Sequence, residues 1–165
     1  MKKNLITILV HNRPGVLSHV AGLVTRRGYN VESIAAGPTE DHSVTRITLV
    51  VAGDTATVEQ VVKQFQKLID VISVEILEHE DALTGELAII TLKAGPGRRN
   101  RIVNLASHMG FRLIDILADR VTIQVAGSAR DVDTAVAALT PYTIVAMART
   151  GLVALPRRTD TVEAS

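Results

Sequence analysis

Residues 5–17, LITILVHNRPGVL, carry the pattern on which the rest of the fold depends. The apolar run from Leu5 to Val10 predicts a strand. From Val16 to Val24 the apolar residues recur at helical spacing, and Gly28 stands where a helix commonly ends. The stretch between them, residues 12–15, has the composition of a turn followed by a helix start. The chain is therefore predicted to begin as strand, turn and helix.

Strand and helix patterns then continue in the same part of the chain. Asn30 to Ala36 and Ser43 to Val51 predict two strands joined by a hairpin turn. A helical stripe behind Asp54 extends as far as Ile69, and Val71 to Leu77 predicts a further strand. The stripe consists of Val58, Val61, Val62, Phe65, Leu68 and Ile69. The order β-α-β-β-α-β is that of a ferredoxin-like unit, in which two helices cover one face of a four-stranded antiparallel sheet.

The same order recurs from Leu87 to Ala148, so the sequence repeats with a period of about half the chain. Apolar residues at helical spacing predict helices over 102–109 and 132–139, the second behind Ser128 as N-cap. We therefore predict an α+β protein with two ferredoxin-like units in tandem. The predicted boundaries are 1–79 for the first unit, 80–85 for a linker, 86–151 for the second unit and 152–165 for a flexible tail.

The first predicted strand, Leu5 to Val10, is apolar on both faces. A half-solvated antiparallel strand would instead place polar groups on one face. We therefore expect a second layer to cover the face that the helices leave open. The second half of the chain or another copy of the protein could provide it.

The composition excludes several classes of function. Among the 165 residues, 18 basic and 17 acidic side chains nearly balance, which gives no support for electrostatic binding to nucleic acid or to an anionic membrane. The chain has no cysteine, so disulfides and thiolate metal sites are excluded and a reducing cytoplasm is the expected location. No apolar run approaches the roughly 18 residues that a membrane span needs.

No arrangement of side chains in the sequence predicts catalysis. Ser18 and His19 are neighbours on a predicted helix and point about 100° apart, so they cannot act as nucleophile and base. The other histidines lie in separate segments without the spacing of metal ligands. The acidic run Glu78 to Asp81 could hold a hard cation, although a solvated strand end is the simpler interpretation. We predict no catalytic residue, no metal and no cofactor in this chain.

RNA binding is a further possibility for ferredoxin-like units, some of which stack bases on aromatic strand residues. Only 2% of this chain is aromatic, and none of these residues forms the aromatic strand motif of that class. One basic cluster, Arg98, Arg99 and Arg101, precedes a predicted helix start where an anion could bind. A solvated loop is the simpler interpretation of that cluster, and we predict no nucleic-acid partner.

The turn between the first strand and the first helix has features of a carboxylate site. Gly15 lets a ligand approach the backbone, and the amides after it are unsatisfied donors at the positive end of a helix dipole. Asn12 adds a side-chain amide that both donates and accepts, so both charged groups of an amino acid could be bound. Taken alone, however, a turn that merely starts a helix would be the favoured interpretation.

A second segment favours the carboxylate site over a plain helix start. It is Arg26-Arg27-Gly28-Tyr29-Asn30-Val31-Glu32-Ser33-Ile34. Together with Pro14-Gly15-Val16-Leu17 it closely resembles the ACT-domain small, regulatory subunits of acetohydroxyacid synthase (acetolactate synthase). Further matches are Gly37-Pro38-Thr39-Glu40, Gln66-Lys67-Leu68-Ile69-Asp70-Val71 and Ala148-Arg149-Thr150-Gly151-Leu152-Val153-Ala154-Leu155. The resemblance covers nearly the whole chain and is looser around Pro96 to Met109.

The resemblance implies that residues 1–79 form an ACT domain and that the chain is not itself an enzyme. Members of this family bind a large catalytic subunit that carries thiamine diphosphate, Mg²⁺ and usually FAD. They raise the activity of that subunit in the biosynthesis of valine, leucine and isoleucine, and they make it sensitive to feedback inhibition by valine.

The resemblance also implies a homodimer formed through the ACT domain, with the effector bound between two chains. The implied valine-binding residues are Asn12, Gly15, Val16 and Leu17 of one chain and Asn30 and Val31 of the other. The alternative is a free-standing ACT-domain amino-acid sensor that regulates another enzyme or a transcription factor.

Overall fold

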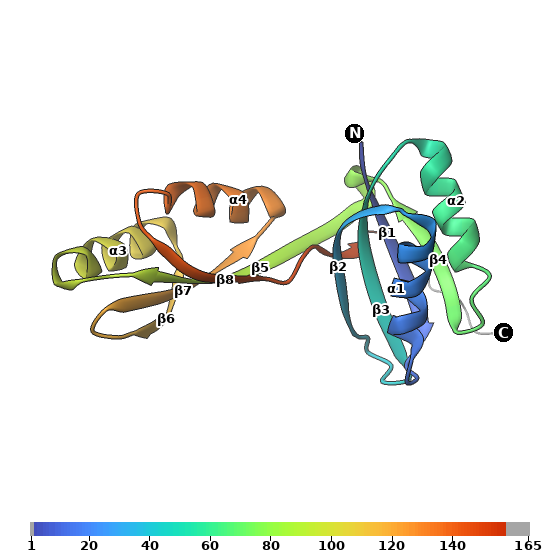
Figure 1. The fold of residues 1–165 in the computed structure, drawn as a ribbon, viewed down its shortest axis with the longest axis horizontal. Helices are drawn as coiled ribbons and strands as arrows, with labels where there is room; N and C mark the ends of the chain where they lie inside the picture. Colours follow the sequence, from blue (N-terminus) through green and yellow to red (C-terminus); the bar gives the residue numbers. More distant parts are fainter. Residues whose placement is uncertain (1, 158–165) are drawn as a thin grey trace. The chain divides into compact units, whose positions relative to one another are not determined.

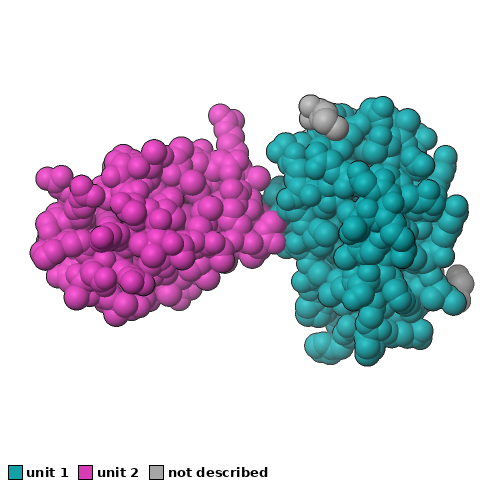
Figure 2. Space-filling view, viewed as in Figure 1, with its two compact units in different colours: residues 1–84, 152–165 teal, residues 85–151 magenta. Residues whose placement is uncertain are grey.

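The computed structural model describes residues 2–157 and divides the chain into two compact units (Figures 1 and 2). Unit 1 comprises residues 1–84 and 152–165, and unit 2 comprises residues 85–151. No helix in the described part of the chain is long and apolar enough to cross a membrane.

Unit 1 is built on a four-stranded antiparallel sheet with two helices on one face (Figure 1). Its spatial strand order is β2-β3-β1-β4, so the first strand of the chain lies inside the sheet. The elements are β1 (Lys3–His11), α1 (Val16–Arg27), β2 (Asn30–Pro38), β3 (Val44–Ala52), α2 (Thr55–Phe65) and β4 (Val71–Leu77).

The core of unit 1 lies between the sheet and its helices. Alternate residues of β1, namely Ile6, Ile8 and Val10, are at most 1% exposed and pack in one cluster with Val20 of α1 and Phe65 of α2. Burial of each such side chain contributes roughly 1.5–3 kcal/mol. The helices are therefore held in place by one face of the central strand.

The ends of the helices follow from local chemistry. Gly28 has φ 65 and donates its N–H to the carbonyls of Thr25 and Val24, so it ends α1 in the left-handed conformation that glycine favours. At the start of α2, the Asp54 carboxylate accepts the Thr57 N–H at 2.8 Å. The hydrogen bonds from Thr57 lower the pKa of Asp54, so this cap is lost only as the pH falls through the lowered value.

The helix α2 is shorter than its apolar stripe predicts. It ends at Phe65, where the N–H groups of Lys67 and Leu68 bond to carbonyls three residues back and tighten the chain into a turn. Leu68 still packs against the core, but Ile69 is 94% exposed. The helical spacing of Ile69 was therefore accidental.

The opposite face of β1 is partly covered by the same chain. Leu5 is buried in a second cluster with Leu77, Ala82 and Ala154. Ala154 belongs to β9 (Val153–Pro156), which pairs with β5 (Ala82–Lys93). This strand falls in the stretch predicted as a tail, whose residues 158–165 lie outside the described residues.

Unit 2 repeats the architecture of unit 1. Its strand order is β6-β7-β5-β8, with all three pairings antiparallel. A short 3-10 turn, η1 (His79–Asp81), and the start of β5 occupy the stretch predicted as a linker. The remaining elements are α3 (Pro96–Met109), β6 (Arg112–Ile116), β7 (Arg120–Gly127), α4 (Ala129–Ala138) and β8 (Ile144–Arg149).

The predicted fold class, two βαββαβ units in tandem, is confirmed. Ser128 caps α4 as predicted and forms a reciprocal capping box with Asp131, and its hydrogen bonds lower the pKa of that carboxyl. The helix α3 starts at Pro96, well before the first residue of its predicted stripe, because proline suits the first helical position. Arg98, Arg99 and Arg101 consequently lie in the first two turns of a helix and not in a loop.

The contrast between Phe65 and Ile69 gives a test of the fold. Phe65→Ala should lower the free energy of unfolding by about 3–5 kcal/mol, because it opens a cavity at a fully buried position. Ile69→Ala should change it by less than about 0.5 kcal/mol. Urea unfolding followed by circular dichroism measures both, and a large loss for Ile69→Ala would contradict the end of α2 at Phe65.

Candidate functional site

The candidate site starts at the N-terminal end of α1. Gly15 has φ 88, a left-handed conformation that few side chains tolerate, and apart from its two chain neighbours no residue has a heavy atom within 4 Å of the position that a Cβ would take. The first helical hydrogen bond is donated by His19 to the Gly15 carbonyl. Among the described residues, the N–H groups of Leu17 and Ser18 have no backbone acceptor. They remain available to an anion at the positive end of the helix.

Asn12 is fixed beside this helix end by the β2–β3 hairpin. Its backbone N–H donates to the Ser43 carbonyl at 2.7 Å, and its side-chain Nδ2 donates to the His42 carbonyl at 3.0 Å. These bonds orient the amide and leave its Oδ1 atom without a partner among the described residues. Oδ1 can therefore accept a hydrogen bond from a bound group.

The hairpin that holds Asn12 is ordered by its own polar groups. The Asp41 carboxylate accepts hydrogen bonds from the Ser43 N–H at 2.8 Å and from its hydroxyl at 2.7 Å. These bonds from Ser43 lower the pKa of Asp41, so the carboxylate stays charged at neutral pH. The carbonyls of His42 and Ser43 are thereby presented at fixed positions to Asn12.

The turn before β4 holds the other side of the same loop. The Asp70 carbonyl accepts the His11 N–H at 2.8 Å, and its carboxylate lies 3.5 Å from a guanidinium nitrogen of Arg13. Asp70 lies in the stretch 66–71 that the family resemblance singled out. No motif in the sequence indicated a role for Asp70, His42 or Ser43, because these residues reach the loop from distant parts of the chain.

The second predicted set, Asn30 and Val31, lies at the start of β2. Asn30 is exposed, whereas Val31 is partly buried against the core. Both line a surface groove of about 620 Å³. The buried hydroxyl of Tyr29, another residue of this groove, has no hydrogen-bond partner among the described residues.

One chain does not bring the two predicted sets together. Asn12, Gly15, Val16 and Leu17 lie at the start of α1, and Asn30 and Val31 follow its end. The 12 residues of α1 rise about 18 Å between them. A single site containing both sets therefore requires a second chain.

A charged cluster in unit 2 is the other candidate. The Arg149 guanidinium donates from Nε and Nη2 to the two oxygens of Glu86, at 2.7 and 2.9 Å, and from Nη1 to Asp133 at 2.9 Å. The pairing with Glu86 raises the pKa of Arg149 above its already high usual value. Because these side chains satisfy one another, the cluster ties together β5, β8 and α4 and offers no group for chemistry.

Metal ligation has no support in the described residues. No group of three His, Asp or Glu side chains comes together there in a way that could hold a metal ion. The His79 side chain, part of the acidic run that could have held a cation, lies outside the described part of the structure.

Comparisons with known proteins agree with the fold of each unit. A family model described as the AHAS small subunit-like ACT domain matches residues 6–73, and one described as the small subunit of acetolactate synthase matches residues 85–158. The first unit is thus an ACT domain, the class to which its strand order and helix layer correspond.

Relatives of known name match over nearly their whole length. The chain is 42% identical to a probable acetolactate synthase small subunit of Archaeoglobus fulgidus, covering 94% of this chain and 97% of the relative. It is 38% identical to the acetolactate synthase small subunit of Bacillus subtilis, covering 96% and 92%. A solved structure of the small subunit from Thermotoga maritima matches with a TM-score of 0.88 and 32% identity, covering 96% and 99%. The chain belongs to the acetolactate synthase small-subunit family.

The Arg149 cluster predicts a specific pattern of stability. Arg149→Met leaves the carboxylate of Glu86, 5% exposed, without its cation, and should cost about 2–3 kcal/mol. This is below the cost at a fully buried pair, because the Arg149 side chain is 32% exposed. Glu86→Leu combined with Arg149→Met should regain most of the loss, measured by urea unfolding. A double variant no more stable than Arg149→Met would contradict this account.

Proposed function

We propose that this chain is the regulatory subunit of acetolactate synthase in the cytoplasm. It binds the large catalytic subunit, raises its activity and makes it sensitive to inhibition by valine. Thiamine diphosphate, Mg²⁺ and FAD belong to the catalytic subunit in this proposal, and this chain supplies none of them. The observation that carries the proposal is the open helix end at Gly15, held beside Asn12 in a chain of this family.

The open helix end suits the carboxylate of an amino acid. The N–H groups of Leu17 and Ser18 donate to the carboxylate, and the helix dipole stabilises a partly buried anion by up to about 2 kcal/mol. Oδ1 of Asn12 accepts a hydrogen bond from the ammonium group. Both charged ends of the ligand are then bound by groups that the hairpin and Asp70 already hold in place.

The side chain of the bound valine packs against an apolar surface of the second chain. This surface consists of Val31 and the groove around it, at the start of β2. Burial of a valine-sized side chain there contributes roughly 1.5–3 kcal/mol to the free energy of binding. Immobilising the ligand subtracts from these gains, so the binding is weak, as suits a sensor of an abundant metabolite.

Unit 1 has a free edge at which such a second chain can bind. β2 is the outer strand of its sheet and pairs only with β3, so the other row of its backbone N–H and C=O groups is unpaired in the described chain. Ile34 on this strand is 45% exposed. In a homodimer formed through these edges, valine favours one arrangement of the two chains. A difference of about 1–3 kcal/mol suffices to transmit this to the catalytic subunit.

The decisive experiment is co-purification with the large subunit, followed by its assay with and without valine. The proposal expects a complex, a higher turnover than that of the large subunit alone and a loss of this gain on adding valine. Failure to form a complex would favour a free-standing amino-acid sensor that controls another enzyme or a transcription factor.

Gly15→Asp should raise the valine concentration for half-inhibition about tenfold or more, because it places a negative charge against the carboxylate site. Gly15→Asn is the matched control. It has the same shape and the same tolerance of the left-handed conformation but no charge. Its effect should be clearly smaller, and activation by both variants should stay near that of the wild type. Equal valine responses in the two variants would contradict the site assignment.

Mixed dimers test whether the site spans two chains. Chains carrying Gly15→Asp and chains carrying Asn30→Ala are co-expressed with different tags, and the mixed dimer is isolated by two affinity steps. One of its two sites then combines an unaltered loop with an unaltered Asn30, so about half of the high-affinity valine binding should return. Calorimetric titration measures this, with each single-variant dimer as the control. A mixed dimer as defective as its parents would place the site within one chain.

A further inference from the structure

The near-neutral charge of the whole chain conceals two oppositely charged units. Residues 85–151 contain eight Lys and Arg and five Asp and Glu, a net charge of +3, whereas the remainder of the chain carries −2. Most of the acids in unit 2 are already engaged. Glu86 and Asp133 pair with Arg149, Asp119 pairs with Arg120, and the Asp131 carboxylate accepts hydrogen bonds from Ser128 in the capping box of α4. The excess positive charge is therefore free to act outside the unit.

Much of this excess gathers at the start of α3. Arg98, Arg99 and Arg101 lie in its first two turns, the first turn holds no acid, and none of the three has an ion pair among the described residues. Cations at the positive end of a helix are unfavourable. By contrast, Asp54 and Asp131 stand at the starts of α2 and α4. A feature that costs local stability is a candidate for a functional role.

Unit 2 also has exposed apolar side chains on its edge strand β6 and just after it. Ile114 and Ile116 of the edge strand β6 are each 47% exposed, and Leu117 after it is 52% exposed. Ile116 lies opposite Val121, which is fully buried on the helix-bearing face. Ile116 itself is on that face but is not covered by α3. Ile114 lies where the register of β6 and β7 shifts, as in a bulge, and faces away from the helices with Asp115, which pairs with Thr122.

The apolar residues and the arginines lie at the same end of unit 2. The Ala94 N–H, just before α3, donates to the Asp119 carbonyl at 2.7 Å, in the turn that links β6 to β7. The Leu117 N–H donates to the Arg120 carbonyl across this turn at 2.8 Å. We call this surface the α3–β6 corner: Arg98, Arg99, Arg101, Ile116 and Leu117.

We infer that the α3–β6 corner is a docking surface for an acidic, partly apolar surface of the catalytic subunit. This rests on the proposed function. Interfaces commonly combine an apolar centre with a charged rim, and the arginines can supply hydrogen bonds as well as steering. The unpaired edge of β6 adds backbone groups that a partner can bind.

Other occupants fit the same surface less well. A second copy docked by the same corner would bring arginines against arginines, since a two-fold interface presents one patch to itself. A nucleic acid would use the arginines, but the exposed apolar side chains of this corner are isoleucine and leucine and not the aromatic residues that stack bases.

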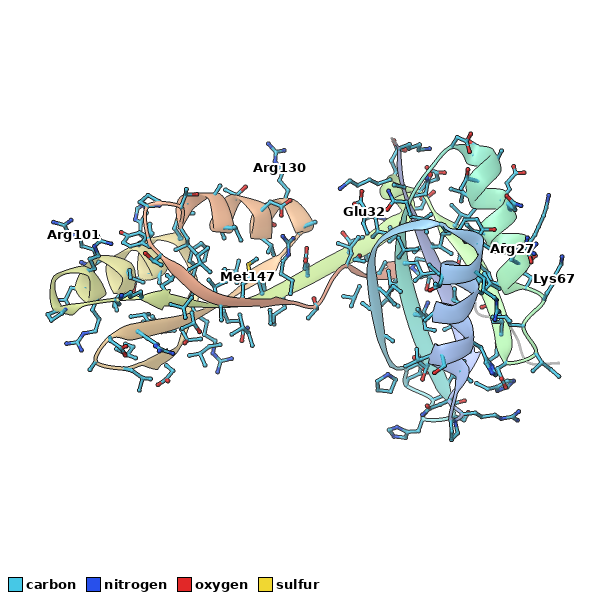
Figure 3. The ribbon with its side chains drawn as sticks, viewed as in Figure 1. Arg27, Glu32, Lys67, Arg101, Arg130 and Met147 are labelled. Carbon is cyan, nitrogen blue, oxygen red and sulfur yellow. The ribbon has the colours of Figure 1, made fainter. Side chains whose placement is uncertain are left out.

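Charge reversal on two helices tests the inference in the full-length protein. Arg98→Glu, alone and with Arg101→Glu, is compared with Arg130→Glu on α4, the matched control in the same unit. Figure 3 shows Arg101 on α3 and Arg130 on α4. Arg98 and Arg130 both lie in the first turn of a helix, where glutamate is favoured, so neither reversal should unfold the protein.

Association with the catalytic subunit is followed by surface-immobilised kinetics at several salt concentrations. The double variant should associate at least about tenfold more slowly than the wild type at low salt, and the difference should shrink as salt is added. Arg130→Glu should stay within about twofold of the wild type. Equal rates for the double variant and Arg130→Glu, with a wild type that binds normally, would overturn the docking surface and leave the proposed function standing.

The apolar centre is tested separately. Leu117→Asp should speed dissociation about tenfold or more, whereas Val145→Asp, on the other sheet edge and 47% exposed, should not. Far-ultraviolet circular dichroism verifies that both variants are folded. A wild type that does not bind the catalytic subunit would defeat the proposed function itself. An altered oligomeric state of the arginine variants without that subunit, or salt-dependent binding of the wild type to a single-stranded RNA probe that the variants lose, would overturn the assignment of the partner.

Discussion

Unit 1 depends on one strand that is buried on both faces. β1 lies inside the sheet between β3 and β4, so neither edge nor face of its middle is left to solvent. Ile6, Ile8 and Val10 on one face require the two helices, and Leu5 on the other requires a second apolar layer. The turn at Gly15 follows directly from this constraint, because the chain must leave β1 and bring α1 back across it within a few residues.

The same turn links the fold to the candidate site. A left-handed glycine lets α1 start abruptly, and an abrupt start leaves N–H groups without internal acceptors. Asn12, fixed to the His42 carbonyl, lies beside them. Packing of the central strand and the open donors at the start of α1 are therefore two results of one local geometry.

The sequence pattern predicted those strands, helices and helix ends that are determined by residues close together in the chain. The strand and helix over residues 5–28, the glycine end of α1 and the Ser128 cap depend on neighbours in sequence, and each was predicted. Contacts between distant segments were not. β9 has four residues and acquires its role only through β5 and Leu5. The start of α3 was not predicted either, because its first turns contain arginines and a glycine in place of an apolar stripe.

The candidate site likewise contains residues that the sequence indicates and residues that only the fold brings to it. Asn12 and Gly15 could be identified from the turn and from the family resemblance, because their chemistry is visible in the residue types. Asp70 lies nearly 60 residues away along the chain from the loop that it holds, and the hairpin carbonyls lie about 30 residues away, so no short motif indicates them. Asn30 and Val31 were assigned only through the family resemblance, and they lie at the opposite end of α1 from Asn12 and Gly15.

The second cluster of unit 1 also bears on the order of synthesis. Ala82 and Ala154 both contact the cluster around Leu5, so unit 2 is nested within the chain of unit 1. On the ribosome, all of unit 2 is made before the strand that completes unit 1 leaves the exit tunnel. Unit 1 therefore stays incomplete, with Leu5 only partly covered, while the whole of unit 2 is synthesised and can fold. The ACT domain, although it precedes unit 2 in the sequence, is thus the later of the two to be completed.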